Sequence, residues 1–311
     1  MINILVTGAA GFIASHIIEE LLKDKNNNVF GIDNFYSGTK ENLDFIKSVD
    51  INGQFKFVES DIRDFENINN LVKEWNIEQI FHLAAIVSVQ TSVQNPLLSH
   101  AVNVKGSLNI LESARLNSVK RIVFSSSAAV YGDEPTQPKN ELSLVRPISP
   151  YGCEKLIVEQ YMKLYNDLYN LETVVLRYFN VYGKRQSVTS DYSGVISIFD
   201  NKFSNSITPN IYGDGEQYRD FVHVHDIVSV NIKAMNKKKI SGEVFCVGTS
   251  EKTSINNLLL RMNKKYNKCV NPNYLDAREG DIKESICDNT KIKKILKIEN
   301  FKKFDCEIIE L

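Results

Sequence analysis

The chain has 311 residues, of which 24% are charged and 43% are hydrophobic, and its formal net charge is -1. This length and composition are those of a globular protein with one large or two modest domains around a substantial core. The near-zero net charge excludes binding of nucleic acid or anionic lipid through the overall charge of the protein. Any anion must therefore be bound by individual Arg or Lys side chains or by helix N-termini.

The cysteines are scattered, odd in number and without a Cys-x-x-Cys pair: Cys153, Cys246, Cys269, Cys287 and Cys306. This pattern fits neither a disulfide framework nor a zinc site and favours a reducing compartment. No apolar run approaches transmembrane length, and the strand-like residues 2–6 leave no room for a signal peptide before them. We expect a soluble cytoplasmic protein that binds neither a membrane nor nucleic acid.

Short β-branched runs alternate with longer amphipathic stretches over the first half of the chain. The expected strands are Asn3–Val6, Val29–Ile32, Phe55–Val58, Gln79–His82, Arg121–Phe124 and Thr173–Leu176. The expected helices between them include Phe12–Lys23, Phe65–Trp75 and Pro96–Leu116, the last with an apolar face that includes Leu97, Leu108 and Leu111. This alternation predicts parallel βαβ units in a doubly wound α/β sheet. It weakens after about residue 177.

The first expected strand runs into a glycine-containing turn that opens the first helix. Gly8 permits the tight turn, and Gly11 allows a pyrophosphate to approach bare backbone N–H groups at the helix N-terminus, beside Phe12 and Ile13. Ala14 stands where a third glycine is usual, which is a modest departure from the pattern. The turn predicts a dinucleotide site.

The ends of the next three strands carry further candidate cofactor residues. Asp33 is placed to accept a hydrogen bond from the adenosine ribose 2′-OH and would repel a 2′-phosphate, so NAD is favoured over NADP. The other candidates are Asn34, Asp61, Ile62, Leu83, Ala84 and Ala85. They gain weight from their position, because open α/β sheets bind ligands at the carboxyl ends of their strands.

A Ser, a Tyr and a Lys suggest proton chemistry. Ser127 follows the fifth strand, and Tyr151 and Lys155 stand four residues apart, on one face of the helix that follows Pro150. A nearby ammonium favours the phenolate, so we expect Lys155 to lower the pKa of Tyr151 towards the working pH. Tyr151 can then act as general base on a sugar hydroxyl, with Ser127 relaying or orienting the proton.

Together with the Ser125–Ser127 and Arg177–Asn180 segments, these motifs resemble the extended short-chain dehydrogenases that act on nucleotide sugars. Within this family the chain is most similar to the UDP-hexose 4-epimerases, including those of UDP-glucose and UDP-N-acetylglucosamine. The resemblance implies that Ser127 and Tyr151 handle protons, that Lys155 also binds the nicotinamide ribose, and that Asn103 supports the site. It implies a homodimer formed through helices near Pro96–Leu116 and Tyr151–Leu168.

The resemblance also implies two domains. We expect residues 1–176 with about 219–248 to form an NAD-binding Rossmann domain. Residues of about 177–218 with 249–311 then form a smaller α/β nucleotide-sugar-binding domain.

Ala128 and Ala129 bear on the reaction type. Dehydratases and decarboxylases of this group carry an acid, commonly Glu, just before the Val-Tyr-Gly segment, and alanine has no proton to give. The remaining chemistry is a hydride shuttle, which is that of an epimerase.

The resemblance assigns substrate contacts in the second half. Asn180, Arg219 and Arg278 match residues that hold the nucleotide diphosphate or its sugar, a task that suits the planar guanidinium fork. Ser88 and Val195 match further lining of the sugar and uracil pockets. Ser285 stands where the family controls space beside the hexose C2 substituent, and a small residue there leans towards tolerance of N-acetyl groups.

His223 and His225 have strand-like spacing but no matching cluster, so we expect structural hydrogen bonding and no metal site. Two alternatives stay open at this point. One is an epimerase of another nucleotide sugar, such as a UDP-uronic acid or a GDP- or CDP-sugar. The other is a non-catalytic NAD-binding regulatory protein, for which the intact Ser127, Tyr151 and Lys155 would be unexpected.

Overall fold

The computed structural model describes residues 1–187, 194–277 and 282–304. Its largest element is a seven-stranded, fully parallel sheet with the order β11-β6-β5-β4-β1-β2-β3. The strands are β1 (Ile2–Thr7), β2 (Asn27–Asp33), β3 (Phe55–Glu59), β4 (Gln79–His82), β5 (Arg121–Ser127), β6 (Glu172–Tyr178) and β11 (Glu243–Val247). This order is that of a Rossmann sheet with one added strand, which confirms the predicted doubly wound α/β fold.

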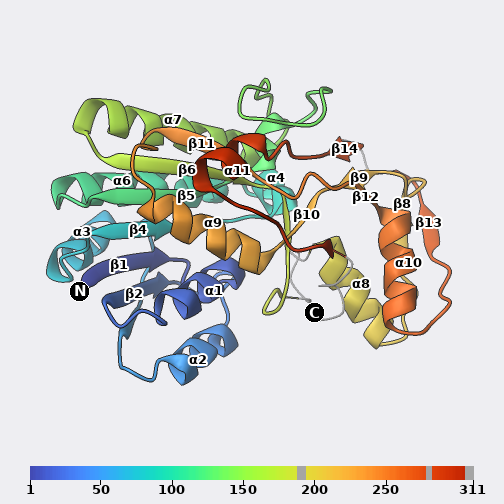
Figure 1. Ribbon diagram of the computed structural model, residues 1–311, viewed down its shortest axis with the longest axis horizontal. Coiled ribbons are helices and arrows are strands. Elements are labelled where there is room, and N and C mark those ends of the chain that lie inside the picture. The colour runs from blue at the N-terminus through green and yellow to red at the C-terminus, as the bar shows by residue number, and fades with distance from the viewer. Residues whose placement is uncertain (188–193, 278–281, 305–311) are drawn as a thin grey trace.

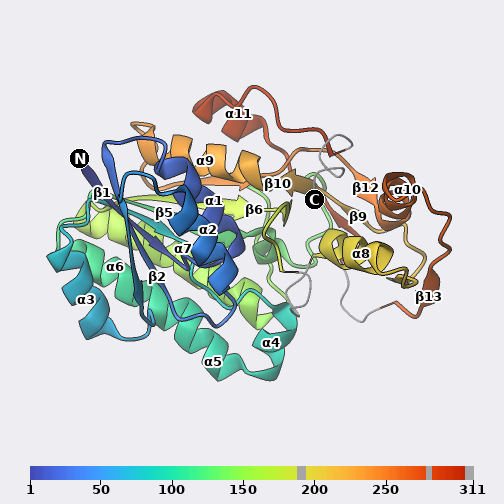
Figure 2. The same cartoon turned by 90° about the horizontal axis from the view of Figure 1, so that it is seen from below.

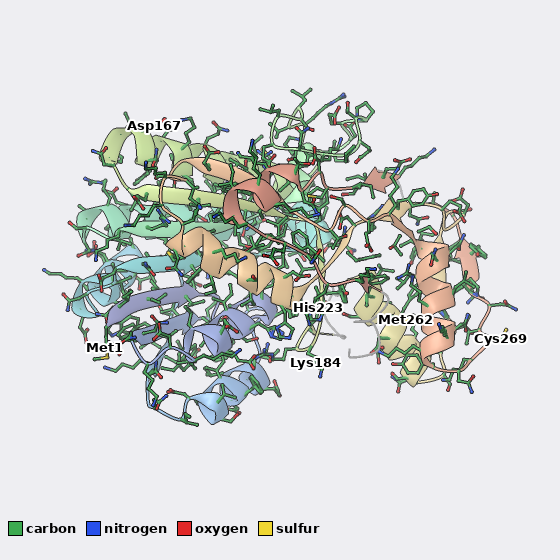
Figure 3. All side chains as sticks on the ribbon, in the orientation of Figure 1. Met1, Asp167, Lys184, His223, Met262 and Cys269 are labelled. Carbon is green, nitrogen blue, oxygen red and sulfur yellow. The ribbon has the colours of Figure 1, made fainter. Side chains whose placement is uncertain are left out.

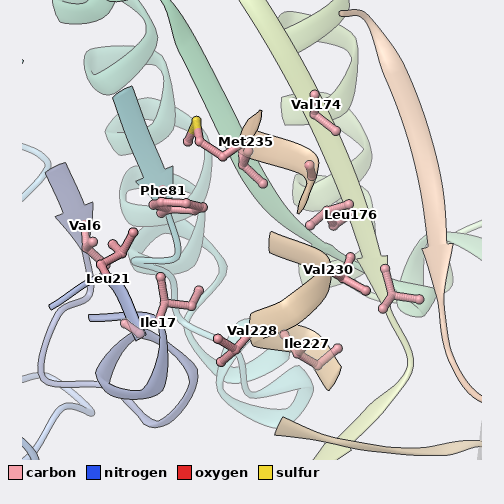
Figure 4. Close-up of a cluster of buried hydrophobic side chains, with 14 of the residues drawn as sticks. Val6, Ile17, Leu21, Phe81, Val174, Leu176, Ile227, Val228, Val230 and Met235 are labelled. Carbon is pink, nitrogen blue, oxygen red and sulfur yellow. The ribbon is translucent and has the colours of Figure 1, made fainter. Parts of the chain in front are cut away.

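Helices cover both faces of the sheet (Figures 1 and 2). One face carries α1 (Phe12–Leu21), α2 (Lys40–Val49) and α9 (Val224–Asn236), and the other carries α3 (Phe65–Glu74), α6 (Ser107–Leu116) and α7 (Pro150–Tyr169). Figure 4 shows the core on the first face, where Val6, Phe81 and Leu176 of the sheet lie near Ile17 of α1 and Ile227 of α9. Burial of these apolar side chains on both faces holds the strand ends in fixed positions.

The predicted helix Pro96–Leu116 is interrupted. It consists of α5 (Pro96–His100), a π-helical segment (Ala101–Gly106) and α6. Leu97, expected on the apolar face, is 87% exposed, whereas Leu111 is fully buried. The single-face prediction was wrong because hydrogen bonds in a π-helical segment span five residues instead of four, which widens the turn and rotates the helix that follows.

A smaller group of elements lies beside the carboxyl ends of the strands (Figure 1). Its helices are α8 (Val195–Ser204) and α10 (Ile255–Lys265). Its strands form three small sheets: β7 (Asn180–Tyr182) with β10 (Phe221–His223); β9 (Tyr218–Arg219) with β12 (Thr253–Ser254) and β14 (Glu284–Ser285); and β8 (Asn210–Tyr212) with β13 (Asn273–Leu275). The remaining helices are α4 (Val89–Gln94) and α11 (Thr290–Leu296), and α11 packs against β11 and α9. The domain boundaries expected from the sequence stay a prediction.

In the described ranges, no helix has the length and apolar character needed to cross a membrane.

Candidate active site

A cavity of about 460 Å³ opens at the carboxyl ends of the large sheet. It extends from the turn after β1 to the end of β5 and the start of α7. All twelve residues expected to bind the cofactor line it: Gly8, Gly11, Phe12, Ile13, Asp33, Asn34, Asp61, Ile62, Leu83, Ala84, Ala85 and Lys155. Ser127, Tyr151 and Asn180 line the same cavity, so the structure brings the two expected sites together.

The glycine turn is shaped by contacts that a side chain would block. Gly8 has a φ of +70°, and a Cβ there would lie 3.0 Å from the backbone of Ala84. A Cβ on Gly11 would lie 2.9 Å from the carbonyl oxygen of Gly8. Gly11 also occupies the N-cap of α1, where glycine has no side chain to cap the first N–H groups. These groups are directed to the cavity end of the helix and suit a phosphate anion.

Two carboxylates stand where the adenosine half of a dinucleotide would lie. Asp33 accepts hydrogen bonds from the backbone N–H groups of Ala10 (3.0 Å) and Phe35 (2.7 Å), and burial raises its pKa. Asp61 is paired with Arg63 at 2.7 Å, and this contact lowers its pKa to about 2. Asp33 is thus held at the end of β2 by two backbone N–H groups, while Asp61 is already paired with the Arg63 guanidinium.

The start of α7 sets the position of Tyr151. Ser149 caps the helix by accepting from the N–H of Gly152 (3.1 Å), and the N–H of Tyr151 donates to Ser92 (3.2 Å). A Cβ on Gly152 would lie 2.5 Å from the carbonyl oxygen of Ala129, so the helix rests directly on the backbone after β5. This close approach brings Tyr151 to Ser127.

Ser127, Tyr151 and Lys155 lie close together at the end of β5. The Ser127 hydroxyl forms a hydrogen bond with the Tyr151 phenol. The Lys155 ammonium donates to the carbonyl oxygen of Ser125 at 2.7 Å and lies 5.8 Å from the centre of the Tyr151 ring. The geometry suits proton transfer between Tyr151 and a hydroxyl bound in the cavity.

The electrostatics differ from the expectation. The pKa of Tyr151 is raised to about 12, because burial and, to a smaller extent, the negative charge of Glu154 raise it more than the hydrogen bond with Ser127 lowers it. Burial lowers the pKa of Lys155 to about 8, although Glu154 and Glu159 oppose the change. The prediction that Lys155 lowers the Tyr151 pKa towards neutrality was wrong for the protein without its cofactor. Desolvation disfavours both the phenolate and the ammonium, and this effect is the largest on each pKa.

The other expected substrate residues that the structure describes lie outside the set that lines the cavity. Ser88 is buried and caps α4, accepting from the N–H of Thr91 at 2.9 Å. Val195 begins α8, directly after the cavity-lining Gly194. Arg219 donates to the carbonyl oxygens of Tyr218 and Ile282 and is paired in register with Ser285 across β9 and β14. Arg278 lies outside the described residues.

The histidines near the cavity have structural contacts. His223 ends β10 and His225 lies in the first turn of α9, so the expected strand spacing was wrong; the N–H of His225 donates to His223 Nδ1 at 3.3 Å. Lys184 and His223 both lie in the middle of the molecule, between the large sheet and α8 (Figure 3). Over residues 1–187, 194–277 and 282–304, no group of three or more His, Cys, Asp or Glu side chains is arranged to hold a metal ion.

Sequence reasoning missed two charged residues near the site. Arg185 lines the cavity, contacts His16 and Glu19 of α1, and stacks on Phe45 at 4.3 Å. Glu159 is buried under the site and pairs with Arg177. The spacing of Tyr151, Lys155 and Glu159, four residues apart twice, was a signal for the second, because these positions share one helix face. No sequence signal pointed to Arg185.

Several known proteins are similar to this chain over nearly its whole length. A putative UDP-glucose 4-epimerase of Methanocaldococcus jannaschii is 40% identical over 293 residues, which cover 94% of this chain and 92% of that protein. The crystal structure of UDP-glucose 4-epimerase from Thermotoga maritima with UDP-glucose has a TM-score of 0.92 and 36% identity. It covers 99% of this chain and 96% of that chain.

UDP-N-acetylglucosamine 4-epimerase from Methanobrevibacter ruminantium, in complex with UDP-N-acetylmuramic acid, has the same TM-score, identity and coverage. Residues 4–248 match the model of a family described as the NAD dependent epimerase/dehydratase family. The glycine turn, the oriented Asp33 and the cavity that joins them to Tyr151 are the features that NAD and its nicotinamide end require. The chain therefore belongs to the NAD-dependent epimerase/dehydratase family.

Proposed function

We propose that the protein is an NAD-dependent isomerase that epimerises UDP-hexoses at C4 through a transient 4-keto sugar. The observation that carries the proposal is the Ser127–Tyr151–Lys155 group, placed in one cavity with the dinucleotide turn. Ala128 and Ala129, which follow Ser127 directly, offer no acid for a dehydration or a decarboxylation. The names of the similar proteins given above support the same activity.

Each residue of the group has a defined task. Tyr151 removes the proton from the sugar O4 and later returns it, while Ser127 holds the phenol and the hydroxyl in line. Lys155 binds the nicotinamide ribose and presents a positive charge to the phenol. The residues around the glycine turn would hold NAD, which would supply a reversible hydride acceptor and a positive charge that favours the phenolate. Because no net oxidation occurs, the cofactor is retained.

We propose that the sugar pocket also admits N-acetylated hexoses, that is, UDP-GlcNAc and UDP-GalNAc. Ser285 is small, and its pairing with Arg219 places it next to a side chain expected to hold the diphosphate. Arg278, Asn180, Ser88 and Val195 complete the proposed substrate contacts. A small residue permits the N-acetyl group without requiring it, so all four UDP-hexoses belong in the test.

The experiment is incubation of the purified protein with UDP-Glc, UDP-Gal, UDP-GlcNAc and UDP-GalNAc separately, with products resolved by NMR. We expect the C4 epimer of each accepted sugar and no accumulation of NADH. A steady rise of NADH without epimer would refute the epimerase. A panel with UDP-uronic acids and GDP- and CDP-sugars identifies a different nucleotide sugar. Y151F tests the base: we expect it to lose turnover and keep NAD, which also separates an enzyme from a silent NAD-binding protein.

We further propose a cytoplasmic homodimer formed through the outer faces of α5, α6 and α7. Leu164 and Leu168 of α7 are 47% and 65% exposed, and Leu97 of α5 and Leu116 of α6 are exposed too. Because α5 and α6 both pack against α7, these large apolar side chains lie on neighbouring helices, where a second subunit could bury them. Light scattering should give twice the chain mass for the wild type and the chain mass for L164E/L168E. A monomeric wild type would refute the dimer.

A further inference from the structure

Glu154 is a buried carboxylate between the two residues that carry the proposed chemistry. Its exposed fraction is 3%, and it has no task in the mechanism above. Its Oε2 accepts hydrogen bonds from the Ser99 hydroxyl (2.6 Å) and from the Asn103 side-chain amide (2.7 Å). A carboxylate is costly to bury unless it is hydrogen-bonded, and here two neutral donors converge on one oxygen. These contacts therefore hold the Glu154 carboxylate in one defined position.

Asn103 connects this carboxylate to the wall of the cavity. Its side chain clamps the backbone of Ile86 from both sides: Oδ1 accepts from the N–H at 2.8 Å, and Nδ2 donates to the carbonyl oxygen at 2.9 Å. Ile86 lines the cavity and lies two residues after Ala84, whose backbone lies against the glycine turn. Glu154 thus ties the start of α7 to the loop after β4.

A buried chain of hydrogen bonds holds Asn103 from the other side. The Thr7 hydroxyl accepts from two backbone N–H groups after β4, so it donates its own proton to His82 Nδ1 at 2.8 Å. Burial lowers the pKa of His82 to about 3, and the neutral ring then donates from Nε2 to Ser107 at 2.9 Å. Ser107 donates to the Asn103 carbonyl oxygen at 2.5 Å. Every link has one direction, so Asn103, and with it Glu154, is fixed in place.

We propose that Glu154 is a positioning residue for Tyr151 and Lys155, whose buried anion anchors α7 to Asn103 and acts on the charges of both groups. The proposal rests on the proposed function in one respect, that these two residues handle the proton.

The negative charge of Glu154 acts on both groups in the same direction. It favours the protonated form of Lys155 and disfavours the phenolate of Tyr151, and it raises both pKa values. Among the described residues, the other titratable groups around the pair include Glu159, Arg177, His82 and Tyr178. Glu159 forms an ion pair with Arg177, His82 is neutral, and the Tyr178 phenol is hydrogen-bonded to Asn231. Glu154 is held by neutral donors, so its charge is not offset in the same way.

The test is E154Q, which keeps an oxygen acceptor for Ser99 and Asn103 and removes the charge. D167N is the matched control, because it removes one negative charge at the exposed far end of the same helix. In the holoenzyme with ring-carbon-labelled tyrosine, Y151F assigns the Tyr151 NMR signal. We expect the Tyr151 signal of E154Q to titrate about half a pH unit or more below that of the wild type. The Tyr151 signal of D167N should titrate as in the wild type. Coincident titrations of E154Q and wild type would overturn the proposal.

Turnover gives a second readout. Both limbs of the pH–rate profile of E154Q should move to lower pH, because Tyr151 and Lys155 shift together. E154L also removes the oxygen that accepts from Ser99 and Asn103, so we expect E154L to lose NAD that E154Q retains. Equal NAD retention in the two variants would refute the anchoring role. If the wild type epimerises no UDP-sugar, the proposed function fails, while the NMR titration and the NAD retention still decide on Glu154.

Discussion

The ion pair of Arg177 and Glu159 allows a quantitative test of what holds the active-site floor. The Arg177 guanidinium donates to Glu159 at 2.6 Å and 3.0 Å and to the Tyr131 hydroxyl at 2.9 Å. Ser126, next to the proposed catalytic Ser127, donates to the same carboxylate at 2.5 Å. Both charged side chains are buried, with exposed fractions of 7% and 3%. Substitution of one partner leaves the other charge in the core without its counter-ion.

We expect R177M to lower the free energy of unfolding by about 3–5 kcal/mol, the usual cost of leaving half of a buried ion pair. Unfolding entropy of about 2.1 cal/mol/K per residue gives about 0.65 kcal/mol/K for this chain. A loss of about 4 kcal/mol therefore corresponds to a fall of about 6 °C in the midpoint of thermal unfolding. E159Q should destabilise too, and the double variant R177M/E159Q should cost clearly less than the sum of the two.

The assay is urea unfolding of the wild type, both single variants and the double variant, at equal NAD content because bound ligand adds stability. R115M is the control: the Arg115–Glu112 pair is bidentate like the buried one but lies at the surface, and we expect little change. The reasoning is refuted if R177M costs less than about 1 kcal/mol or if the two substitutions are additive.

Three further predictions follow from single positions. D33S should weaken NAD binding and narrow the preference for NAD over NADP, measured by calorimetric titration of both cofactors; an unchanged ratio would contradict the role of Asp33. Burial lowers the pKa of Lys155 from its usual 10.5 to about 8, so the unfolded chain binds more protons between these values. Stability should therefore rise with pH across that window in the wild type more than in K155M, as followed by urea midpoints. Gly132 has a φ of +54°, and a Cβ there would lie 1.9 Å from the Arg146 carbonyl oxygen. G132A should therefore lower the free energy of unfolding by at least about 1–3 kcal/mol. An unchanged urea midpoint would contradict this, because the loop would then accommodate the methyl group.

Much of the cofactor site was predictable because it follows from the order of the strands. Gly8 follows β1, and Asp33 and Ser127 are the last residues of β2 and β5. In a parallel sheet the carboxyl ends of all strands meet at one edge. Tyr151 and Lys155 were predictable from helix periodicity, which fixes side chains four residues apart on one face. Such local rules survive folding when the large sheet forms as expected.

Features that depend on tertiary hydrogen bonds were not predictable. The π-helical segment Ala101–Gly106 has a sequence that reads as ordinary helix, and its position agrees with the contacts that Asn103 and Ser107 make with other elements. The pairing of Arg219 with Ser285 joins strands of two residues each, too short for any periodic pattern. The direction of the Tyr151 pKa shift was missed because sequence spacing shows a neighbouring charge and says nothing of burial.

The depth of the site has a consequence for the base. Burial moves Tyr151 and Lys155 towards their neutral forms, whereas the proposed reaction needs a phenolate beside an ammonium. Glu154 favours the Lys155 ammonium and opposes the Tyr151 phenolate. Its charge therefore helps one of the two charged forms and disfavours the other. The phenolate must then be favoured by Ser127 and by positive charge brought in with the oxidised cofactor. Such a base would be deprotonated mainly where NAD is bound, and the same burial that raises its pKa would keep water away from the reacting groups.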